Sequence, residues 1–341
     1  MNDILMHKRI LVTGATGLIG SHLVNRLLEM GAEVIALGRN EKKLKDVLGE
    51  VYNNENISLM AENISKRIPE KLGRLDYIFH AASPVSGDEI KSRPVDVISA
   101  NLNGISNCLE FLKKQKEELH VNGRLIVFSS ATIYTNSGDH DVCVDESQTE
   151  NAESINSGTA PYSEAKRMAE VTALAYQKQY GIDVVIARIG YVYGYSRICP
   201  RTAFYEFIFK AISGEDIVLN HSGISRRDNI YVDDVVNGLL CILRNGVTGE
   251  AYNISSNAEK GNFAAADEMA GIVAEIINKQ LGYNEISVTC NVPEMKRKSG
   301  VILDNKKMKC LGWTLQTGLY EGIYQTVQQY RRDKDLFNDW I

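Results

Sequence analysis

Paired cysteines, long apolar runs and an excess of positive charge are all missing from this sequence. The six cysteines are scattered and contain no Cys-x-x-Cys pair, so they predict free thiols rather than a disulfide framework or a metal site. No apolar run approaches membrane-spanning length, and the N-terminal apolar stretch is too short for a signal peptide. The net charge of -5 gives no electrostatic reason to expect nucleic acid or an anionic membrane as a partner. We therefore expect a cytoplasmic protein.

Apolar segments of strand length alternate with helical patterns through the first half of the chain, beginning with Arg9 to Thr13 and Glu33 to Leu37. This alternation predicts an α/β fold with a doubly wound parallel sheet of the Rossmann type. The second half is less regular and predicts a smaller C-terminal α/β lobe. We place the lobes mainly in residues 1–190 and 191–341, interleaved in one compact unit, because no repeat or flexible linker separates them. Residues 136–158 are rich in Asp, Glu, Ser and Asn and predict a long surface loop.

The segment T-G-A-T-G-L-I-G spaces Gly14, Gly17 and Gly20 evenly between a buried strand and an amphipathic helix. Glycine permits a positive φ and the close approach of a pyrophosphate, while the helix N-terminus supplies free N–H groups. The alternative is a tight strand-to-helix turn without a ligand, but the strand and helix around the glycines favour a dinucleotide site. The predicted contacts here are Gly14, Thr16, Gly17, Leu18 and Ile19.

The end of the second strand bears on which dinucleotide binds. A carboxylate there would bond the ribose 2′-OH of NAD, whereas an arginine accommodates the 2′-phosphate of NADP. Gly38 stands at the strand tip and Arg39 follows it, which favours NADP. The alternative is that Arg39 is a solvated loop cation, which leaves NAD open. Further cofactor contacts are predicted near the adenine and at a strand end of small residues; these are Asn40, Glu62, Asn63, Ile64, Ala81, Ala82 and Ser83.

Tyr162 and Lys166 lie four residues apart in a segment of helical character, so their side chains project from one face. A lysine cation one turn away favours the phenolate, which predicts a lowered pKa for Tyr162 and makes it a general acid/base. Ser130, at the end of the strand RLIVFSS, is placed to bond the same substrate oxygen, and Ser129 is the less favoured serine. A Tyr-x-x-x-Lys pair alone is common on solvated helices. The glycine turn and Ser130 upstream make the catalytic interpretation the stronger one.

Together these motifs resemble the extended short-chain dehydrogenase/reductase family, in its nucleotide-sugar epimerase, dehydratase and reductase branch, over essentially the whole chain. The resemblance implies that Lys166 also contacts the nicotinamide ribose, while Tyr162 exchanges a proton with a sugar hydroxyl as hydride passes to or from nicotinamide C4. It also implies that Asn101 and Ser129 border the cofactor. A homodimer is implied through the Tyr162-bearing helix and its neighbour.

The second half resembles the part of this branch that binds a nucleotide sugar. The segment from Ser225 to Asp234 matches one in which an arginine grips the substrate diphosphate, and by position that arginine is Arg227. A guanidinium suits the task because its fork of donors matches phosphate oxygens. Arg297 is a candidate for another phosphate contact. The remaining predicted substrate contacts are Ser83, Thr132 and Tyr191.

Departures from the pattern decide which reaction we expect. Thr132 stands where dehydratases and decarboxylases of the branch carry glutamate, so elimination and decarboxylation are disfavoured. Tyr191 replaces the usual asparagine in the segment that begins at Arg188, so nucleotide contacts differ in detail. With no carboxylate at Gly38, the best prediction is an NADPH-dependent 4-ketoreductase, and the alternative is a 4-epimerase that retains NAD. A non-catalytic cofactor-sensing protein has no reason to keep Ser130, Tyr162 and Lys166 together.

Overall fold

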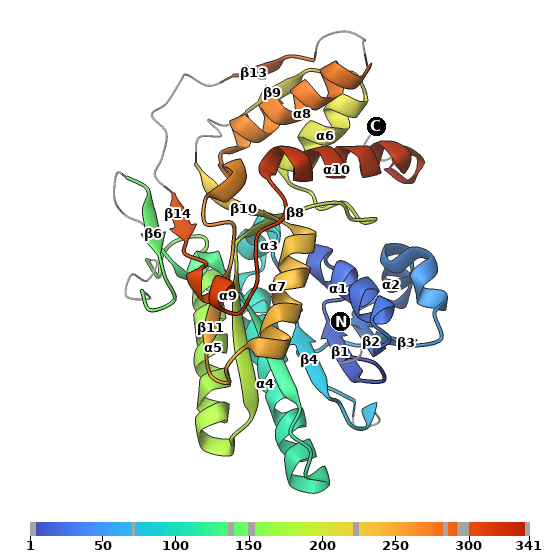
Figure 1. Cartoon of the computed structure of the whole chain (residues 1–341), viewed down its shortest axis with the longest axis vertical. Coiled ribbons are helices and arrows are strands. Elements are labelled where there is room, and N and C mark those ends of the chain that lie inside the picture. The colour runs from blue at the N-terminus through green and yellow to red at the C-terminus, as the bar shows by residue number, and fades with distance from the viewer. Residues whose placement is uncertain are drawn as a thin grey trace.

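The computed structural model describes residues 5–69, 72–135, 140–148, 154–220, 225–281, 286–291 and 300–337. These residues form a seven-stranded parallel sheet covered by helices, with a smaller group of helices and strands above it (Figure 1). The strand order is β11-β7-β5-β4-β1-β2-β3. Strands β2 and β3 follow β1 on one side and β4 begins the other side, so the order along the sheet switches between β1 and β4, although all the strands are parallel. The predicted Rossmann-type α/β fold is therefore confirmed. The strands are β1 (Arg9–Thr13), β2 (Glu33–Gly38), β3 (Ile57–Ala61), β4 (Tyr77–His80), β5 (Arg124–Ser130), β7 (Asp183–Ile189) and β11 (Ala251–Ile254).

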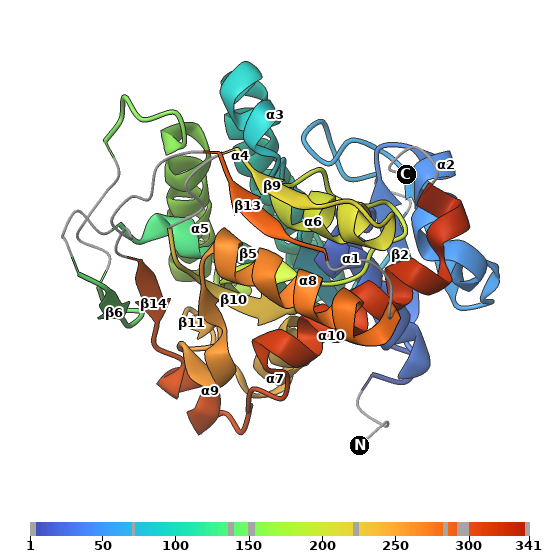
Figure 2. The same ribbon diagram turned by 90° about the horizontal axis from the view of Figure 1, so that it is seen from above.

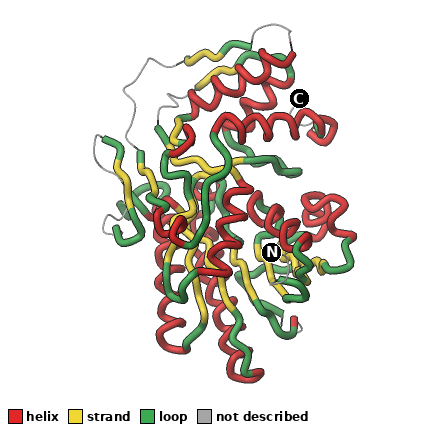
Figure 3. Tube along the Cα trace, viewed as in Figure 1, coloured by secondary structure: helices red, strands yellow, loops and turns green. Residues whose placement is uncertain are grey.

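Helices cover both faces of the sheet (Figure 3). Side chains of β1 alternate between the faces: Ile10 and Val12 pack in the cluster that includes α1 and α7, whereas Leu11 packs with α4 and α5. Because both faces are buried, the strands are almost continuously apolar, as expected for a parallel sheet. The helices of the sheet layer are α1 (Leu18–Glu29), α2 (Glu41–Leu48), α3 (Gly87–Ser92), α4 (Pro94–Leu119), α5 (Ala160–Tyr180) and α7 (Val232–Asn245).

The upper layer has its own apolar core, in which Phe209, Tyr330 and Ile276 are almost completely buried. Its helices α6 (Ala203–Ile212), α8 (Ala266–Leu281) and α10 (Leu319–Arg332) gather in one layer in both views (Figures 1 and 2). Strands β9 (Ile217–Leu219) and β13 (Val288–Cys290) pair beside them. The three-stranded sheet β12-β10-β8 contains β8 (Tyr191–Tyr193), β10 (Arg227–Tyr231) and β12 (Phe263–Ala264).

A third small sheet takes one of its two strands from the segment predicted to be a surface loop. Strand β6 (Val142–Val144) pairs in parallel with β14 (Val301–Leu303), so two segments far apart in sequence meet there. Strand β11, from the second half of the chain, pairs with β7 of the main sheet. No helix among the described residues is both long and apolar enough to span a bilayer. The remaining helical elements are η1 (Gly49–Asn53), η3 (Ala131–Ile133), η4 (Glu259–Gly261), α9 (Lys306–Cys310) and η5 (Lys334–Phe337).

Candidate active site

The glycine turn joins β1 to α1 at the carboxyl edge of the main sheet. Gly14 has φ +67°, and a Cβ there would lie 2.8 Å from the carbonyl carbon of Ala81. A Cβ on Gly20 would collide with the carbonyl oxygen of Gly14. Gly17 occupies the N-cap of α1, and no side chain caps the helix. The turn therefore combines a cradle that side chains would fill with a helix N-terminus of uncapped N–H groups, which fits a dinucleotide pyrophosphate.

Behind the turn, a buried hydrogen-bond chain joins β1 to the end of β4. The Thr13 hydroxyl accepts from the Ala82 N–H at 3.2 Å and shares a 2.9 Å hydrogen bond with His80 Nδ1. Burial lowers the pKa of His80 to about 3, with Lys166 acting in the same direction, so the imidazole is neutral near pH 7. These hydrogen bonds hold Ala81 and Ala82 against Gly14.

Most of the other predicted cofactor residues lie in the turn or directly after β2 and β3, although two of their side chains have local structural tasks. Asn40 Oδ1 accepts from the Lys43 N–H at 2.9 Å and caps α2, and Asn63 Oδ1 accepts from the Ser65 N–H at 3.0 Å. Arg39 is exposed just after β2. Of the remaining residues, Leu18 and Ile19 begin α1, the Thr16 methyl lies beside Gly38, the Glu62 N–H donates to the Gly38 carbonyl, and Ile64 is buried.

Ser83 and Asn101 meet between the end of β4 and helix α4. The Ser83 hydroxyl donates to Asn101 Oδ1 at 2.9 Å, and Asn101 Nδ2 donates to the Val97 carbonyl at 2.8 Å. Asn101 is buried, so this contact fixes α4 against the loop that follows β4. The structure thus brings Ser83 and Asn101 into direct contact, a pairing that their separation in sequence gave no means of predicting.

Ser130 ends β5 and is the centre of a group of hydroxyls. Its Oγ accepts from the Thr132 N–H at 3.2 Å and from the Thr132 hydroxyl at 3.0 Å. Burial raises the pKa of Tyr162, and a side-chain contact with Ser130 opposes that rise, so the two hydroxyls lie close together. Ser130 therefore accepts from Thr132 and adjoins Tyr162. The neighbouring Ser129 hydroxyl is buried and has no hydrogen-bond partner within the described part of the chain.

Tyr162 and Lys166 share one face of α5, as predicted from their spacing. Lys166 Nζ lies 5.7 Å from the centroid of the Tyr162 ring and donates to the Phe128 carbonyl at 2.8 Å. Burial raises the pKa of Tyr162 to about 12, with Ser130 opposing it and Tyr191 adding to it. The sequence predicts a lowered pKa for Tyr162, but burial outweighs the favourable contacts. Burial also lowers the pKa of Lys166 to about 8.

The predicted substrate residues Tyr191 and Arg227 lie on paired strands beside this group. The Arg227 guanidinium carbon is 4.9 Å from the Tyr191 ring centroid, and Tyr191 is close enough to Tyr162 to influence its pKa. Both Tyr191 and Arg227 are exposed. Arg297 lies outside the described residues. The structure thus gathers Ser130, Thr132 and Tyr162 near the Tyr191–Arg227 pair.

Sequence reasoning missed two charged residues, one on α5 and one on the neighbouring strand β7. Arg188 and Glu170 form a buried ion pair at 2.8 Å, with side chains 7% and 8% exposed. Two signals could have indicated them. Arg188 interrupts an apolar strand, and Glu170 follows Lys166 by one helical turn on the same face.

Comparisons with known proteins identify the family of this chain. The model of the NAD dependent epimerase/dehydratase family matches residues 10–255. UDP-glucuronic acid decarboxylase 5 of Arabidopsis thaliana is 31% identical over 95% of this chain and 89% of its own length. UDP-glucuronic acid decarboxylase 1 of Xenopus tropicalis is 28% identical over 96% of this chain and 73% of its own.

Solved structures superimpose on nearly the whole chain. UDP-glucose 4-epimerase of Thermotoga maritima, solved with UDP-glucose, has a TM-score of 0.76 at 26% identity and covers 96% of this chain and 99% of its own. WbmF of Bordetella bronchiseptica, solved with NAD+ and UDP, has a TM-score of 0.75 at 22% identity, with 98% and 96% covered, and shows the shared fold. The chain is therefore an enzyme of the NAD dependent epimerase/dehydratase family, an extended short-chain dehydrogenase/reductase.

Proposed function

We propose that this enzyme oxidises a UDP-linked sugar at C4 and uses Tyr162 as the acid/base. The observation that carries the proposal is the gathering of Ser130, Tyr162 and Lys166 beside the glycine turn, with the Tyr191–Arg227 pair adjoining them. Residues 1–190 supply mainly the dinucleotide site, and residues 191–341 supply mainly the nucleotide-sugar site.

Each side chain has a distinct task in this reaction. Ser130 holds the sugar oxygen, Tyr162 Oη exchanges the proton of that hydroxyl, and Arg227 binds the diphosphate. Lys166, with its pKa lowered to about 8, is still mostly protonated at neutral pH and places positive charge beside the phenol. The dinucleotide, held by Gly14, Gly17 and the N-terminus of α1, supplies a hydride acceptor and donor when bound.

Decarboxylation of a UDP-linked uronic acid is the overall reaction we favour. The decarboxylase relatives include one 31% identical over 95% of this chain, which favours this activity over the 4-ketoreductase expected from the sequence. The chemistry follows from oxidation at C4, because the C5 carboxylate then belongs to a β-keto acid. The bond between C5 and the carboxyl carbon breaks and CO2 leaves, while the electron pair of that bond stays on the sugar and forms an enolate with the C4 carbonyl. C5 then takes up a proton, and the C4 ketone is reduced again by the hydride that was removed.

Epimerisation at C4 is the second candidate, and Thr132 is the observation that favours it. Thr132 places a neutral hydroxyl, hydrogen-bonded to Ser130, where decarboxylases of the branch are expected to carry glutamate. Both candidates return the hydride to the substrate, so neither consumes the cofactor. A ketoreductase would consume one cofactor for each turnover, and this difference separates it from both.

We propose NAD as the cofactor. The family model is described as NAD dependent, and solved relatives contain NAD, including the Bordetella bronchiseptica protein. The exposed Arg39 after β2 is the observation that favours NADP instead. Mass spectrometry of the purified protein identifies whichever dinucleotide is retained.

The proposed reaction is tested with UDP-glucuronic acid and catalytic NAD. Release of CO2 with formation of a UDP-pentose supports the decarboxylase, whereas inversion at C4 without CO2, seen by NMR, supports the epimerase. Stoichiometric oxidation or reduction of the cofactor contradicts both. Tyr162→Phe is expected to lower turnover by about 10²–10⁴-fold. Tyr176→Phe is the matched control, because Tyr176 lies on the same helix but its hydroxyl bonds Glu110 at the exposed surface.

We also propose a homodimer through α4 and α5. Apolar side chains remain exposed on both helices, Val95 and Ile98 on α4 and Met168 and Val171 on α5. Burial of such side chains against a second copy is favourable because it removes apolar area from water. Sedimentation equilibrium should give a dimer for the wild type and a monomer for Val171→Asp.

A further inference from the structure

Arg188, in β7, lies at the centre of a buried polar network behind the catalytic helix. Its Nε and Nη2 donate to the two oxygens of Glu170 at 3.0 and 2.8 Å, a bidentate contact. Its Nη1 donates to the Tyr134 hydroxyl at 2.8 Å and to the Glu146 carbonyl at 2.7 Å. A guanidinium fork can satisfy these acceptors in one plane, which a lysine could not do.

The Glu170 arm reaches the catalytic residues along α5. Glu170 follows Lys166 by one helical turn and Tyr162 by two, so the three side chains lie on one face. The Glu170 carboxylate raises the pKa of Lys166, against the lowering by burial. The Arg188–Glu170 pair therefore fixes α5 against β7 and also acts on the charge of Lys166.

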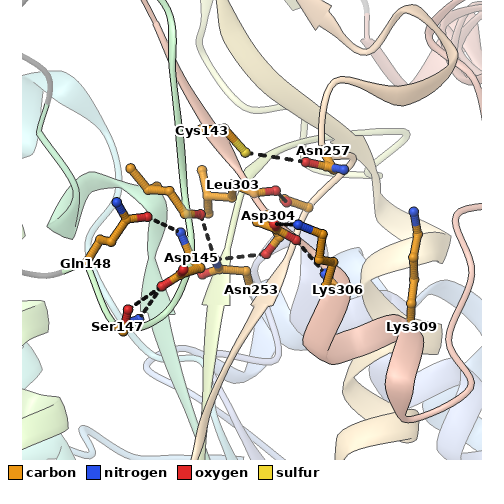
Figure 4. Close-up of polar contacts among 12 residues, drawn as sticks. Cys143, Asp145, Ser147, Gln148, Asn253, Asn257, Leu303, Asp304, Lys306 and Lys309 are labelled. Atoms are coloured by element: carbon orange, nitrogen blue, oxygen red, sulfur yellow. Dashed lines mark hydrogen bonds and ion pairs between the residues drawn. The ribbon is translucent and has the colours of Figure 1, made fainter.

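The Tyr134 arm reaches the loop that carries Thr132. Tyr134 donates to Asn253 Oδ1 at 2.8 Å, and Asn253 N–H donates to Glu146 Oε1 at 2.7 Å. Asn253 Nδ2 in turn donates to the Asp304 carbonyl at 3.1 Å (Figure 4). Each polar group has a partner, so the network joins β7, the loop after β5 and β11 without leaving a hydroxyl unpaired.

Several titratable groups surround the Lys166 ammonium. Tyr162 and Glu170 share its helix, and His80 faces it from β4 with a pKa lowered to about 3 by burial. From β5 the neutral Phe128 carbonyl accepts a hydrogen bond from the ammonium. Within the described residues, Glu170 is therefore the carboxylate that favours a charged Lys166.

We propose that Glu170 and Arg188 are positioning residues for the catalytic pair. Glu170 keeps Lys166 charged beside Tyr162, and Arg188 holds Glu170 in that position while fixing the Thr132 loop through Tyr134. The catalytic part of this inference rests on the proposed function. A pair that only stabilised the fold would leave the titration of Lys166 unchanged.

The test measures the titration of Lys166 without any substrate. Only the neutral amine reacts with acetic anhydride, so labelling of the Lys166 peptide across a pH series, followed by mass spectrometry, reports its pKa. The wild type is expected to give a midpoint near pH 8. Glu170→Gln should lower the midpoint by about one pH unit, because it removes an opposite charge. Because no substrate is needed, failure of the proposed function would leave this measurement intact.

Glu164→Gln is the matched control, since Glu164 lies on the same helix but pairs with Arg167 at 3.8 Å. It should leave the midpoint unchanged. A Glu170→Gln midpoint equal to the wild type, in protein with unchanged circular dichroism, would overturn the proposal. If Glu170→Gln does not fold, Glu170→Asp keeps the charge but withdraws the carboxylate from Arg188. Glu170→Asp should lower kcat about tenfold with little change in KM, and wild-type kcat in that variant would equally overturn it.

Discussion

The guanidinium of Arg227 lies over the ring of Tyr191, 4.9 Å from its centroid, while the adjacent Arg226 has different partners. Arg226 pairs with Asp141 at 3.2 Å and lies over the ring of Phe263 at 4.3 Å. Arg227 begins β10 and Arg226 immediately precedes the strand, and their contacts give the two arginines different surroundings. Arg226 contributes to the fold, whereas Arg227 is exposed beside the proposed catalytic group.

Arg227→Met should therefore weaken binding of the nucleotide sugar. Loss of a charge-assisted contact to a diphosphate costs about 1.5–3 kcal/mol, which corresponds to an increase in KM of about 10–150-fold with little change in kcat. Steady-state kinetics with UDP-glucuronic acid measure both KM and kcat. Arg226→Met is the matched variant, and it should lower Tm while KM stays near the wild-type value. Equal KM values for the two variants would contradict the assignment of Arg227.

Gly14→Ala should prevent dinucleotide binding as well as destabilise the fold. Gly14 and Gly73 have nearly the same φ, +67° and +64°, but a Cβ on Gly14 would lie within 3 Å of backbone atoms, whereas a Cβ on Gly73 would meet nothing within 4 Å. Gly73→Ala is therefore the matched control, and both substitutions cost about 1–2 kcal/mol of stability because alanine disfavours the left-handed conformation. Gly14→Ala adds a clash with Ala81, so its Tm should fall further and the protein should purify without dinucleotide. A Gly14→Ala protein that retains its cofactor would contradict the assignment of the turn.

Arg39→Ala tests which dinucleotide the end of β2 selects. If NAD is the cofactor, the Kd for NAD should change by less than about twofold, because an exposed cation has no phosphate to bind there. Any affinity of the wild type for NADP should be lost in Arg39→Ala, because the arginine is the group that would bind the 2′-phosphate. A wild-type protein that prefers NADP, with the preference lost in Arg39→Ala, would restore the expectation drawn from the sequence.

Local patterns were enough to predict the sheet and the glycine turn. Apolar runs of strand length and the turns between them predict the strands that begin at Arg9 and Glu33. The four-residue spacing of Tyr162 and Lys166 predicts that they share a helix face. Strand β6 was missed because its pairing with β14 depends on residues far away in sequence, within a segment of loop-like composition. Pairing of that kind leaves little local signal.

The electrostatics of the site could not be predicted from spacing alone. The sequence places Lys166 one turn from Tyr162, but burial by surrounding elements decides the pKa of both. The partnership of Arg188 with Glu170 likewise forms only when α5 packs on the sheet beside β7. Such properties depend on tertiary packing rather than on the order of residues.

Lys166→Met should make the protein more stable at neutral pH although it removes one residue of the proposed catalytic pair. The folded-state pKa of Lys166 is about 8, below its ordinary value of 10.5, because the ammonium is buried. Below pH 8 the folded state therefore carries a penalty of about 3 kcal/mol for a charged, buried amine. The lost charge-assisted hydrogen bond to Phe128 offsets at least about 1.5 kcal/mol, so the free energy of unfolding should rise by no more than about 1.5 kcal/mol at pH 7.

The advantage of Lys166→Met should shrink as the pH rises. Between pH 8 and 10.5 the unfolded wild type binds more protons than the folded wild type, so the stability of the wild type increases with pH and approaches that of the variant. Urea denaturation at pH 7, 8, 9 and 10 measures the difference. Lys178→Met, at an exposed position on the same helix, should show no such trend. A stability difference that stays constant with pH would mean that Lys166 is not held at a lowered pKa by burial.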